Sequence, residues 1–236
     1  MISKRGLGEI NPEKSPQSLA ALNQLIADSP AMVKGGSRAV LGEGPLHPDI
    51  AFVGEQPGDR EDATGRPFVG PAGKLLDKAM AEAGIDRKRT YITNVVKHFK
   101  YEPRANRRIH SRPSSGGIKR YCWWLKKELE LVEPRLVVAL GATAALALTG
   151  KPMAVAKNRG PATFEGRPSY LTVHRSFLLR MPEEKRAAAY RAFVADMKQI
   201  LKLAQQSIRP ELWRARMPPL GVVLLWTKSA SLQSCL

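Results

Sequence analysis

The chain has few cysteines, few acidic residues and no long apolar run, and each shortage excludes a class of protein. Two cysteines, Cys122 and Cys235, in 236 residues argue against a disulfide framework and fit a reducing compartment. The N-terminal stretch MISKRGLGEINPEK lacks the apolar core of a signal peptide, and no segment reaches the ~18 apolar residues of a membrane helix. The sequence therefore predicts a cytoplasmic protein with no membrane partner.

The shortage of acidic residues leaves the chain strongly basic. Asp and Glu total 21 against 38 Lys and Arg, so the net charge is +17 and the isoelectric point is near 10.2. Such an excess predicts a polyanionic partner, most often nucleic acid, and hence association with the nucleoid. A basic surface kept for solubility is the alternative. The hydrophobic fraction of 43% is ordinary for a globular domain.

Apolar runs rich in β-branched residues predict four buried strands, at 50–55, 90–97, 136–141 and 169–174. Helical patterns lie between and after them, at about 70–84, 117–132, 142–150 and 183–204. This alternation predicts an α/β fold with three layers, α/β/α, around a central four-stranded, mostly parallel sheet. We expect one domain over residues 1–205, and a C-terminal appendage of unknown role over 206–236.

Polar residues follow the ends of these strands, in the segments GEQPGD, NVVKHFKYEPRANRRIH, LGAT and VHRSFLLR. Ligands of open parallel sheets bind beyond the carboxyl ends of the strands, so these segments should converge on one rim. Glu55 leaves a strand into a Pro-Gly turn, which aims a carboxylate into a cleft or lets it cap a backbone amide. Asn94 ends a buried strand, where its amide must pair with backbone or with a ligand such as a nucleobase edge.

Three further features of the rim have both a functional and a structural interpretation. Phe68 lies in a loop between Gly and Pro residues, as a hydrophobic plug or a stacking platform. His174, like His98, is either a hydrogen-bond donor at a strand end or a satisfied structural group. His110 ends a loop rich in arginine, which is either a solvated basic loop or a phosphate-binding segment around a neutral imidazole.

In combination, GEQPGDREDATGRPFVGPAG, YITNVVKHF, RRIH, LVVALGATA and TVHRSFLLR resemble the uracil-DNA glycosylase superfamily over about residues 20–203. The similarity is greatest to its type X branch (UdgX-like), marked by GEQPGD and RRIH, and next to the family-four enzymes. Members of the type X branch attach covalently to the abasic sugar through the loop histidine. The resemblance implies a DNA glycosylase of base excision repair, a hydrolase that flips uracil out of single- or double-stranded DNA.

The resemblance also implies roles for individual residues. Glu55, His110 and His174 correspond to catalytic residues: the motif A carboxylate, the covalent nucleophile that captures C1′, and the histidine facing uracil O2. Uracil contacts are implied for Gln56, Phe68 and Asn94, and Asp59 belongs to the sugar-facing loop. Contacts with DNA phosphates are expected from arginines of the basic loop and of the segment after His174, namely Arg104, Arg107, Arg108, Arg112, Arg175 and Arg180.

The sequence departs from these relatives at the iron-sulfur cluster, which the resemblance implies. The stretch LIADSPAMVKGG contains no cysteine where a Cys-x-x-Cys pair is usual, and Tyr121 stands at the later ligand position, with Cys122 displaced by one. One cysteine and His98 cannot supply four ligands. We therefore expect no cofactor and no metal, with packing through Trp123 and Trp124 in the cluster's structural role. Arg175 also replaces the usual proline after His174.

Three hypotheses about function follow. The first is a uracil-DNA glycosylase that cleaves the N-glycosidic bond and becomes linked to the sugar C1′ through His110. The second is a multi-turnover, family-four-like enzyme that releases free abasic DNA. The third, from another class, is a non-catalytic DNA-binding protein. A nucleotide-binding protein of unrelated chemistry lacks support, because no GxGxxG or GxxxxGK[ST] loop is present.

Overall fold

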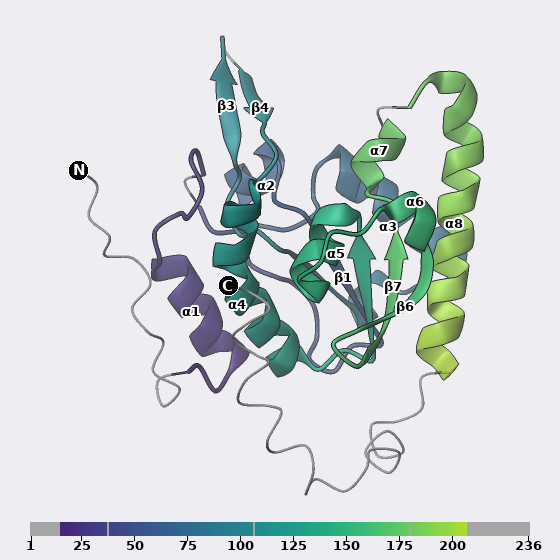
Figure 1. Cartoon of the computed structure of the whole chain (residues 1–236), viewed down its shortest axis with the longest axis horizontal. Coiled ribbons are helices and arrows are strands. Elements are labelled where there is room, and N and C mark those ends of the chain that lie inside the picture. The colour runs from purple at the N-terminus through teal and green to yellow at the C-terminus, as the bar shows by residue number, and fades with distance from the viewer. Residues whose placement is uncertain (1–14, 37, 106, 180, 207–236) are drawn as a thin grey trace, which may run out of the picture.

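A computed structural model describes residues 15–206 except 37, 106 and 180. Its centre is a five-stranded sheet in the order β2-β1-β5-β7-β6 (Figure 1). Four of the strands run parallel, and β6 pairs antiparallel with β7 at one edge. The strands are β1 (Ile50–Gly54), β2 (Thr90–Asn94), β5 (Leu136–Leu140), β6 (Gly160–Phe164) and β7 (Arg167–Thr172).

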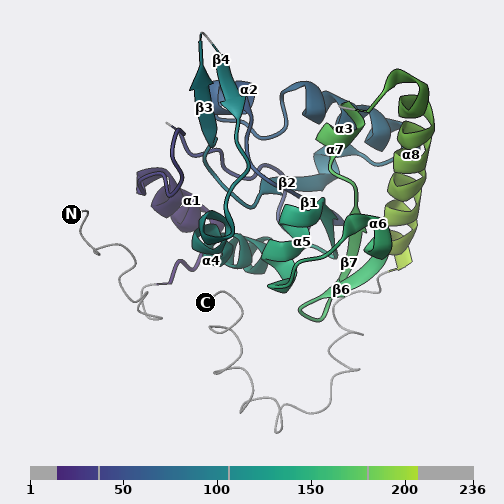
Figure 2. The same ribbon diagram turned by 45° about the horizontal axis from the view of Figure 1, so that its top comes forward.

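Helices cover both faces of the sheet, because the strands are apolar on both faces (Figure 2). Along β1, Ala51 and Val53 belong to one core cluster, whereas Ile50 and Phe52 belong to the other. The first cluster contains residues of α1 (Leu19–Asp28), α4 (Ser115–Val132) and α5 (Ala142–Thr149). The second contains residues of α3 (Pro71–Ala83) and α8 (Glu183–Gln206). The three-layer α/β/α prediction is confirmed.

Local sequence accounts for the ends of the main helices. Helix α3 begins at Pro71, whose missing N–H costs nothing in a first turn, and stops at Gly84, which has a left-handed φ of 79°. Helix α4 is capped by Ser114, whose hydroxyl accepts a hydrogen bond from the Gly117 N–H. These helices fill the connections β1–α3–β2 and β4–α4–β5, so the loops at the carboxyl ends of the strands meet at one rim.

The prediction of four central strands was incomplete, because β6 adds a fifth. A separate hairpin, β3 (Tyr101–Arg104) with β4 (Arg107–His110), also went unpredicted and projects from the rim (Figure 1). Neither segment is an apolar run: β6 is GPATF, and the hairpin strands are YEPR and RRIH. The remaining short elements are α2 (Asp59–Thr64), the 3-10 turn η2 (Arg87–Arg89), α6 (Val155–Asn158) and α7 (Arg175–Leu179).

A buried ion pair braces the segment that leaves β2. Lys97 Nζ lies 2.5 Å from Glu128 Oε2, and both side chains are fully buried. Thr93 and Tyr91 donate further hydrogen bonds to the same carboxylate. Burial, followed by the nearby Glu128 charge, raises the pKa of Tyr91 far above its usual range. Because both partners are buried, removing either would leave an unpaired charge in the core.

The predicted appendage lies almost entirely outside the described residues, since only Gln206, the last residue of α8, belongs to both. The boundary at residue 205 stays a prediction. None of the helices in the described part of the chain has the length and apolar character needed to cross a bilayer.

Candidate active site

Glu55 follows β1 directly, at the rim formed by the carboxyl ends of the parallel strands. Oε2 accepts a hydrogen bond of 2.5 Å from the Thr143 hydroxyl, in the first turn of α5. Oε1 lies 3.6 Å from Nε2 of His110, the last residue of β4. The side chain of Glu55 is only 13% exposed, whereas that of His110 is 47% exposed. Two residues predicted to be catalytic, far apart in sequence, are therefore adjacent.

Gln56 holds the base of the hairpin that carries His110. Its Nε2 donates hydrogen bonds to the Lys100 carbonyl (3.1 Å), just before β3, and to the Ser111 carbonyl (3.2 Å), just after β4. The side chain is nearly buried, at 5% exposure for the residue. This arrangement links both ends of the hairpin to the residue next to Glu55. Contact between Gln56 and uracil stays a prediction.

Arg108 fastens the same hairpin to α2. Its guanidinium donates to Asp59 and to Asp62, each at 2.5 Å, and lies over the rings of Phe99 and Tyr101. The hydrogen bond that Arg108 donates to Asp62 contributes most to raising the pKa of Arg108. A DNA phosphate would have to compete with two carboxylates for this side chain. Asp59, expected to face the sugar, is one of them.

Three other predicted phosphate contacts, Arg104, Arg107 and Arg112, are exposed on the hairpin or directly after it. Arg175 begins α7, immediately after His174. Arg180 lies outside the described residues. The described part of the rim therefore carries exposed cations on the hairpin that also carries His110.

Asn94 and Phe68 approach each other across Gly54, the last residue of β1. A Cβ atom at Gly54 would lie 2.4 Å from Asn94 Oδ1 and 2.8 Å from Phe68 Cζ, so only glycine fits here. Asn94 is 1% exposed, and neither its Oδ1 nor its Nδ2 has a hydrogen-bond partner in the described part of the protein. Phe68 is 2% exposed and has a left-handed φ of 63°. A donor-acceptor pair therefore lies unsatisfied beside an aromatic ring.

His174 lies on the same rim, two residues after β7. Its Nδ1 accepts a hydrogen bond from the Ser176 N–H at 3.3 Å, which places the proton of a neutral ring on Nε2. Gly141, with a φ of 95°, allows this approach, because a Cβ there would lie 2.8 Å from the His174 Cβ. A neutral His174 in this loop therefore has a hydrogen-bond donor, its Nε2–H, near the first residue of α5.

Comparison with known proteins identifies the family of the chain. Residues 41–198 match the family described as the uracil DNA glycosylase superfamily. The chain belongs to that superfamily. The match covers more than half of the 236 residues and includes every predicted catalytic position, Glu55, His110 and His174.

Individual members of the uracil DNA glycosylase superfamily align over parts of the chain. The type-4 uracil-DNA glycosylase of Thermotoga maritima is 42% identical over 147 residues, covering 61% of this chain and 73% of the relative. That of Pyrobaculum aerophilum is 38% identical over 132 residues, covering 55% and 64%. For the enzyme of Sulfurisphaera tokodaii the values are 42% over 106 residues, 44% and 45%, so the chain spans less than half of that relative.

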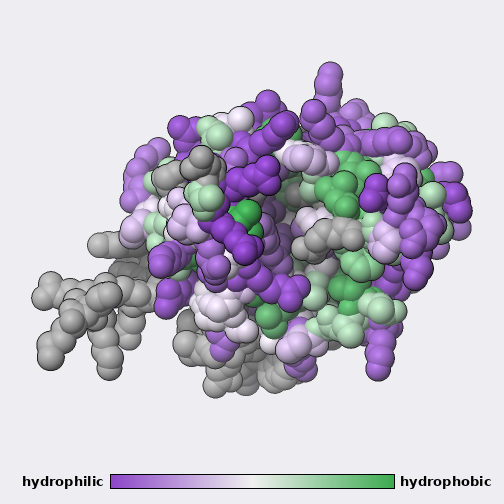
Figure 3. All heavy atoms as spheres, turned by 90° about the horizontal axis from the view of Figure 1, so that it is seen from above, coloured by the Kyte–Doolittle hydropathy of each residue, from purple (hydrophilic) through white to green (hydrophobic). Residues whose placement is uncertain are grey.

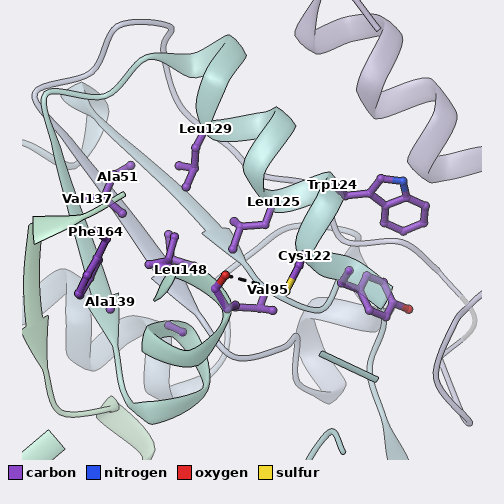
Figure 4. Packing of buried hydrophobic residues seen from close by; sticks show 14 of the residues in the cluster. Ala51, Val95, Cys122, Trp124, Leu125, Leu129, Val137, Ala139, Leu148 and Phe164 are labelled. Carbon is purple, nitrogen blue, oxygen red and sulfur yellow. Dashed lines mark hydrogen bonds between the residues drawn. The ribbon is translucent and has the colours of Figure 1, made fainter. Parts of the chain in front are cut away.

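The iron-sulfur cluster of type-4 members of the superfamily does not fit the residues of this chain. The chain has two cysteines, and Cys235 lies outside the described residues. The sulfur of Cys122 lies in an apolar cluster, 3.9 Å from the Ala147 carbonyl oxygen (Figure 4). In the part of the chain that the structure describes, no three His, Cys, Asp or Glu side chains gather as metal ligands. Four thiolate ligands cannot be assembled.

Tyr121, at the position expected for a cluster ligand, instead joins three segments of the superfamily fold. Its hydroxyl accepts a hydrogen bond from the Met32 N–H (3.0 Å) and lies 2.9 Å from Nδ1 of His98. The ring packs edge-on against Trp124 at 5.4 Å between centroids. Trp124 is buried and Trp123 packs against the same core. The predicted tryptophan packing is present, and the Tyr121 hydroxyl adds a polar link that the sequence did not indicate.

Proposed function

We propose that the protein is a uracil-DNA glycosylase that flips uracil out of DNA, cleaves its N-glycosidic bond and releases free abasic DNA. The observation that carries this proposal is the buried, unpaired amide of Asn94 beside the Phe68 ring. An unsatisfied buried polar group destabilises the folded protein by about 1 to 3 kcal/mol. A ligand that hydrogen-bonds to the amide would remove this destabilisation. A nucleobase offers both a flat surface for the ring and polar atoms for the amide.

An asparagine amide held in one orientation distinguishes uracil from cytosine. The amide can accept from uracil N3–H and donate to uracil O4, whereas cytosine presents an acceptor and a donor at the same two positions. In the orientation that pairs with uracil, the buried amide would be mismatched with cytosine at both atoms. Sites built to hydrogen-bond one pattern reject the opposite pattern strongly, because their buried groups then stay unpaired.

Glu55 and His174 suit the charges that develop as the bond breaks. The sugar becomes an oxocarbenium-like cation and the base leaves as an anion. A carboxylate that is only 13% exposed stabilises positive charge near C1′. The N–H at Nε2 of His174 can donate to uracil O2 as negative charge grows there. Both interactions strengthen toward the transition state, as catalysis requires.

The fate of the sugar cation separates two candidate functions. Capture by water, with turnover, is supported by identity of about 40% to type-4 uracil-DNA glycosylases. Capture by His110 is the second candidate, and the 3.6 Å distance between its Nε2 and Glu55 Oε1 favours it. In that case the Nε2 lone pair bonds to C1′ and the product is a protein-DNA adduct.

A denaturing gel with a uracil-containing single-stranded oligonucleotide tests both candidates. We expect abasic product, revealed by alkaline cleavage, and no product from a thymine oligonucleotide. Glu55→Gln should lower the rate by about 100-fold or more, since it removes a charge that stabilises the transition state. The matched control Glu130→Gln changes an exposed carboxylate of α4 and should leave the rate unchanged.

The same gel reports the fate of the sugar. A heat- and detergent-resistant shifted band that His110→Ser abolishes would select the adduct over turnover. DNA binding without either product, unaffected by Glu55→Gln, would reject the glycosylase proposal and leave a non-catalytic DNA-binding protein.

A further inference from the structure

We propose that Thr143 is a positioning residue for Glu55, fixing which carboxylate oxygen faces the reacting sugar. The inference rests on the proposed function, because it assigns Glu55 to the sugar. The Thr143 hydroxyl donates a 2.5 Å hydrogen bond to Glu55 Oε2, while Oε1 remains on the side of His110. The two oxygens therefore have different neighbours and different tasks.

Thr143 lies on a helix, α5, that is packed into the hydrophobic core. Thr143 is 7% exposed and is the second residue of α5, which follows β5 through Gly141. Its neighbours Ala144 and Ala145 are fully buried in the core cluster shared with β1 and β5. A hydroxyl mounted on a packed helix keeps its position when a ligand enters, whereas Glu55 itself lies in the loop after β1.

The two threonines of α5 use their hydroxyls differently, because Thr143 lies in the first turn and the residue four positions before it, Ala139, belongs to β5. The Thr149 hydroxyl donates to the Ala145 carbonyl of the preceding turn, at 2.8 Å. The Thr143 hydroxyl is directed across the rim to a residue 88 positions away in the sequence. This hydrogen bond links α5 to the loop after β1 and holds the Glu55 carboxylate in one rotamer.

The hydrogen bond from Thr143 fixes the orientation of the Glu55 carboxylate during the reaction. A carboxylate held through Oε2 presents Oε1 at a fixed place, so its charge stabilises the developing cation without reorganisation. Without the hydroxyl, the carboxylate can rotate away from this orientation and pair with water. A hydrogen bond to a charged acceptor that is lost at the reacting centre changes the rate by about 10- to 100-fold. DNA binding should be unaffected, because Thr143 is buried.

The test measures single-turnover excision of uracil and, separately, the Kd for DNA. Thr143→Val should lower the excision rate by about 10- to 100-fold with unchanged Kd, and Thr143→Ser should restore it to within about threefold. Thr143→Ala is a second variant without a donor, should valine disturb folding. The matched control Thr149→Val removes the other hydroxyl of α5 and should leave the rate unchanged.

A double-mutant cycle separates positioning from mere stability. In a Glu55→Gln background, Thr143→Val should cause little further loss, because the group that it orients has already gone. Equal losses in both backgrounds, or a normal rate for both Thr143→Val and Thr143→Ala, would overturn the proposal. Absence of uracil excision by the unmodified protein would instead reject the proposed function, so the two failures are distinguishable.

Discussion

Asn94 lies at the end of a buried strand with both polar atoms of its amide unpaired. The unpaired amide lowers the stability of the fold but leaves two polar atoms for a bound base. Replacing it with leucine, an apolar side chain of similar shape, should raise the free energy of unfolding or leave it unchanged, because an unsatisfied amide is removed. The same change should lower uracil excision by about 100-fold, as the contacts with the base edge are lost. Urea denaturation and single-turnover rates measure the two effects.

Asn158 provides a control for this exchange. Its Nδ2 donates to the Ala154 carbonyl on the surface, so Asn158→Leu should change neither stability nor excision appreciably. A loss of several kcal/mol in Asn94→Leu would show that the amide is satisfied in solution, and would remove the argument that it awaits a base.

His98 is the residue whose titration should affect folding. Burial lowers the pKa of its imidazole, a shift that the nearby Asp62 charge opposes, from an ordinary value of 6.5. A lowered pKa means that the unfolded chain binds the proton more readily, so stability falls as the pH drops below 6.5. The slope for one proton cannot exceed about 1.4 kcal/mol per pH unit. Above pH 7 the contribution should be constant.

Urea denaturation of the unmodified protein and of His98→Gln between pH 5 and 8 measures this effect. The difference in unfolding free energy between the two should depend on pH below 6.5 and be flat above it. Asn158→Gln, which alters an exposed side chain without an ionisable group, is the control and should leave the pH profile unchanged. A difference that is constant over the whole range would contradict a neutral, buried His98.

At the scale of elements, the hairpin β3–β4 depends on contacts with the rest of the protein. Its two four-residue strands are largely exposed and are held by Arg108 and Gln56. Arg108→Ala removes two charge-assisted hydrogen bonds, which we expect to ease local opening by about 2 kcal/mol. Amide hydrogen exchange in residues 101–110 should then be about 30-fold faster.

Arg104→Ala, at the exposed tip of the same hairpin, serves as the control and should leave exchange unchanged. Equal protection in Arg108→Ala would mean that the hairpin is stable by itself. If the hairpin does loosen, His110 moves away from Glu55. In Arg108→Ala the rate of adduct formation should then fall more than the rate of excision.

The elements also show what the sequence could and could not predict. Strands β1, β2, β5 and β7 were predictable, since burial on both faces requires continuous apolar runs. The hairpin was not, because ion pairs to Asp59 and Asp62 and hydrogen bonds from Gln56, all distant in sequence, stabilise it. Glu55, Asn94 and His110 were found through motif resemblance. Thr143 was missed, although LGAT was recognised as a strand end, because the direction of a hydroxyl depends on tertiary packing.

At the scale of the whole molecule, the net charge of +17 should be visible in how salt weakens DNA binding. Seen from above, the surface is largely hydrophilic, and the hydrophobic side chains lie mainly to the right of the middle (Figure 3). A largely hydrophilic surface suits contacts with DNA phosphates. About four contacts with single-stranded DNA predict a slope near −3 for log affinity against log salt. Between 50 and 200 mM salt, affinity should fall about 50-fold.

Removing both hairpin cations, with Arg104→Ala and Arg107→Ala together, should reduce the magnitude of that slope by about 1.4, at about 0.7 for each contact. Arg135→Ala is the control, because Arg135 precedes β5 at the opposite end of the sheet and pairs with Asp49 at 3.2 Å. Fluorescence anisotropy with a uracil-free oligonucleotide measures the slope without interference from catalysis. A slope that Arg135→Ala lowers and the hairpin variant does not would place the DNA on the opposite end of the molecule, away from Glu55.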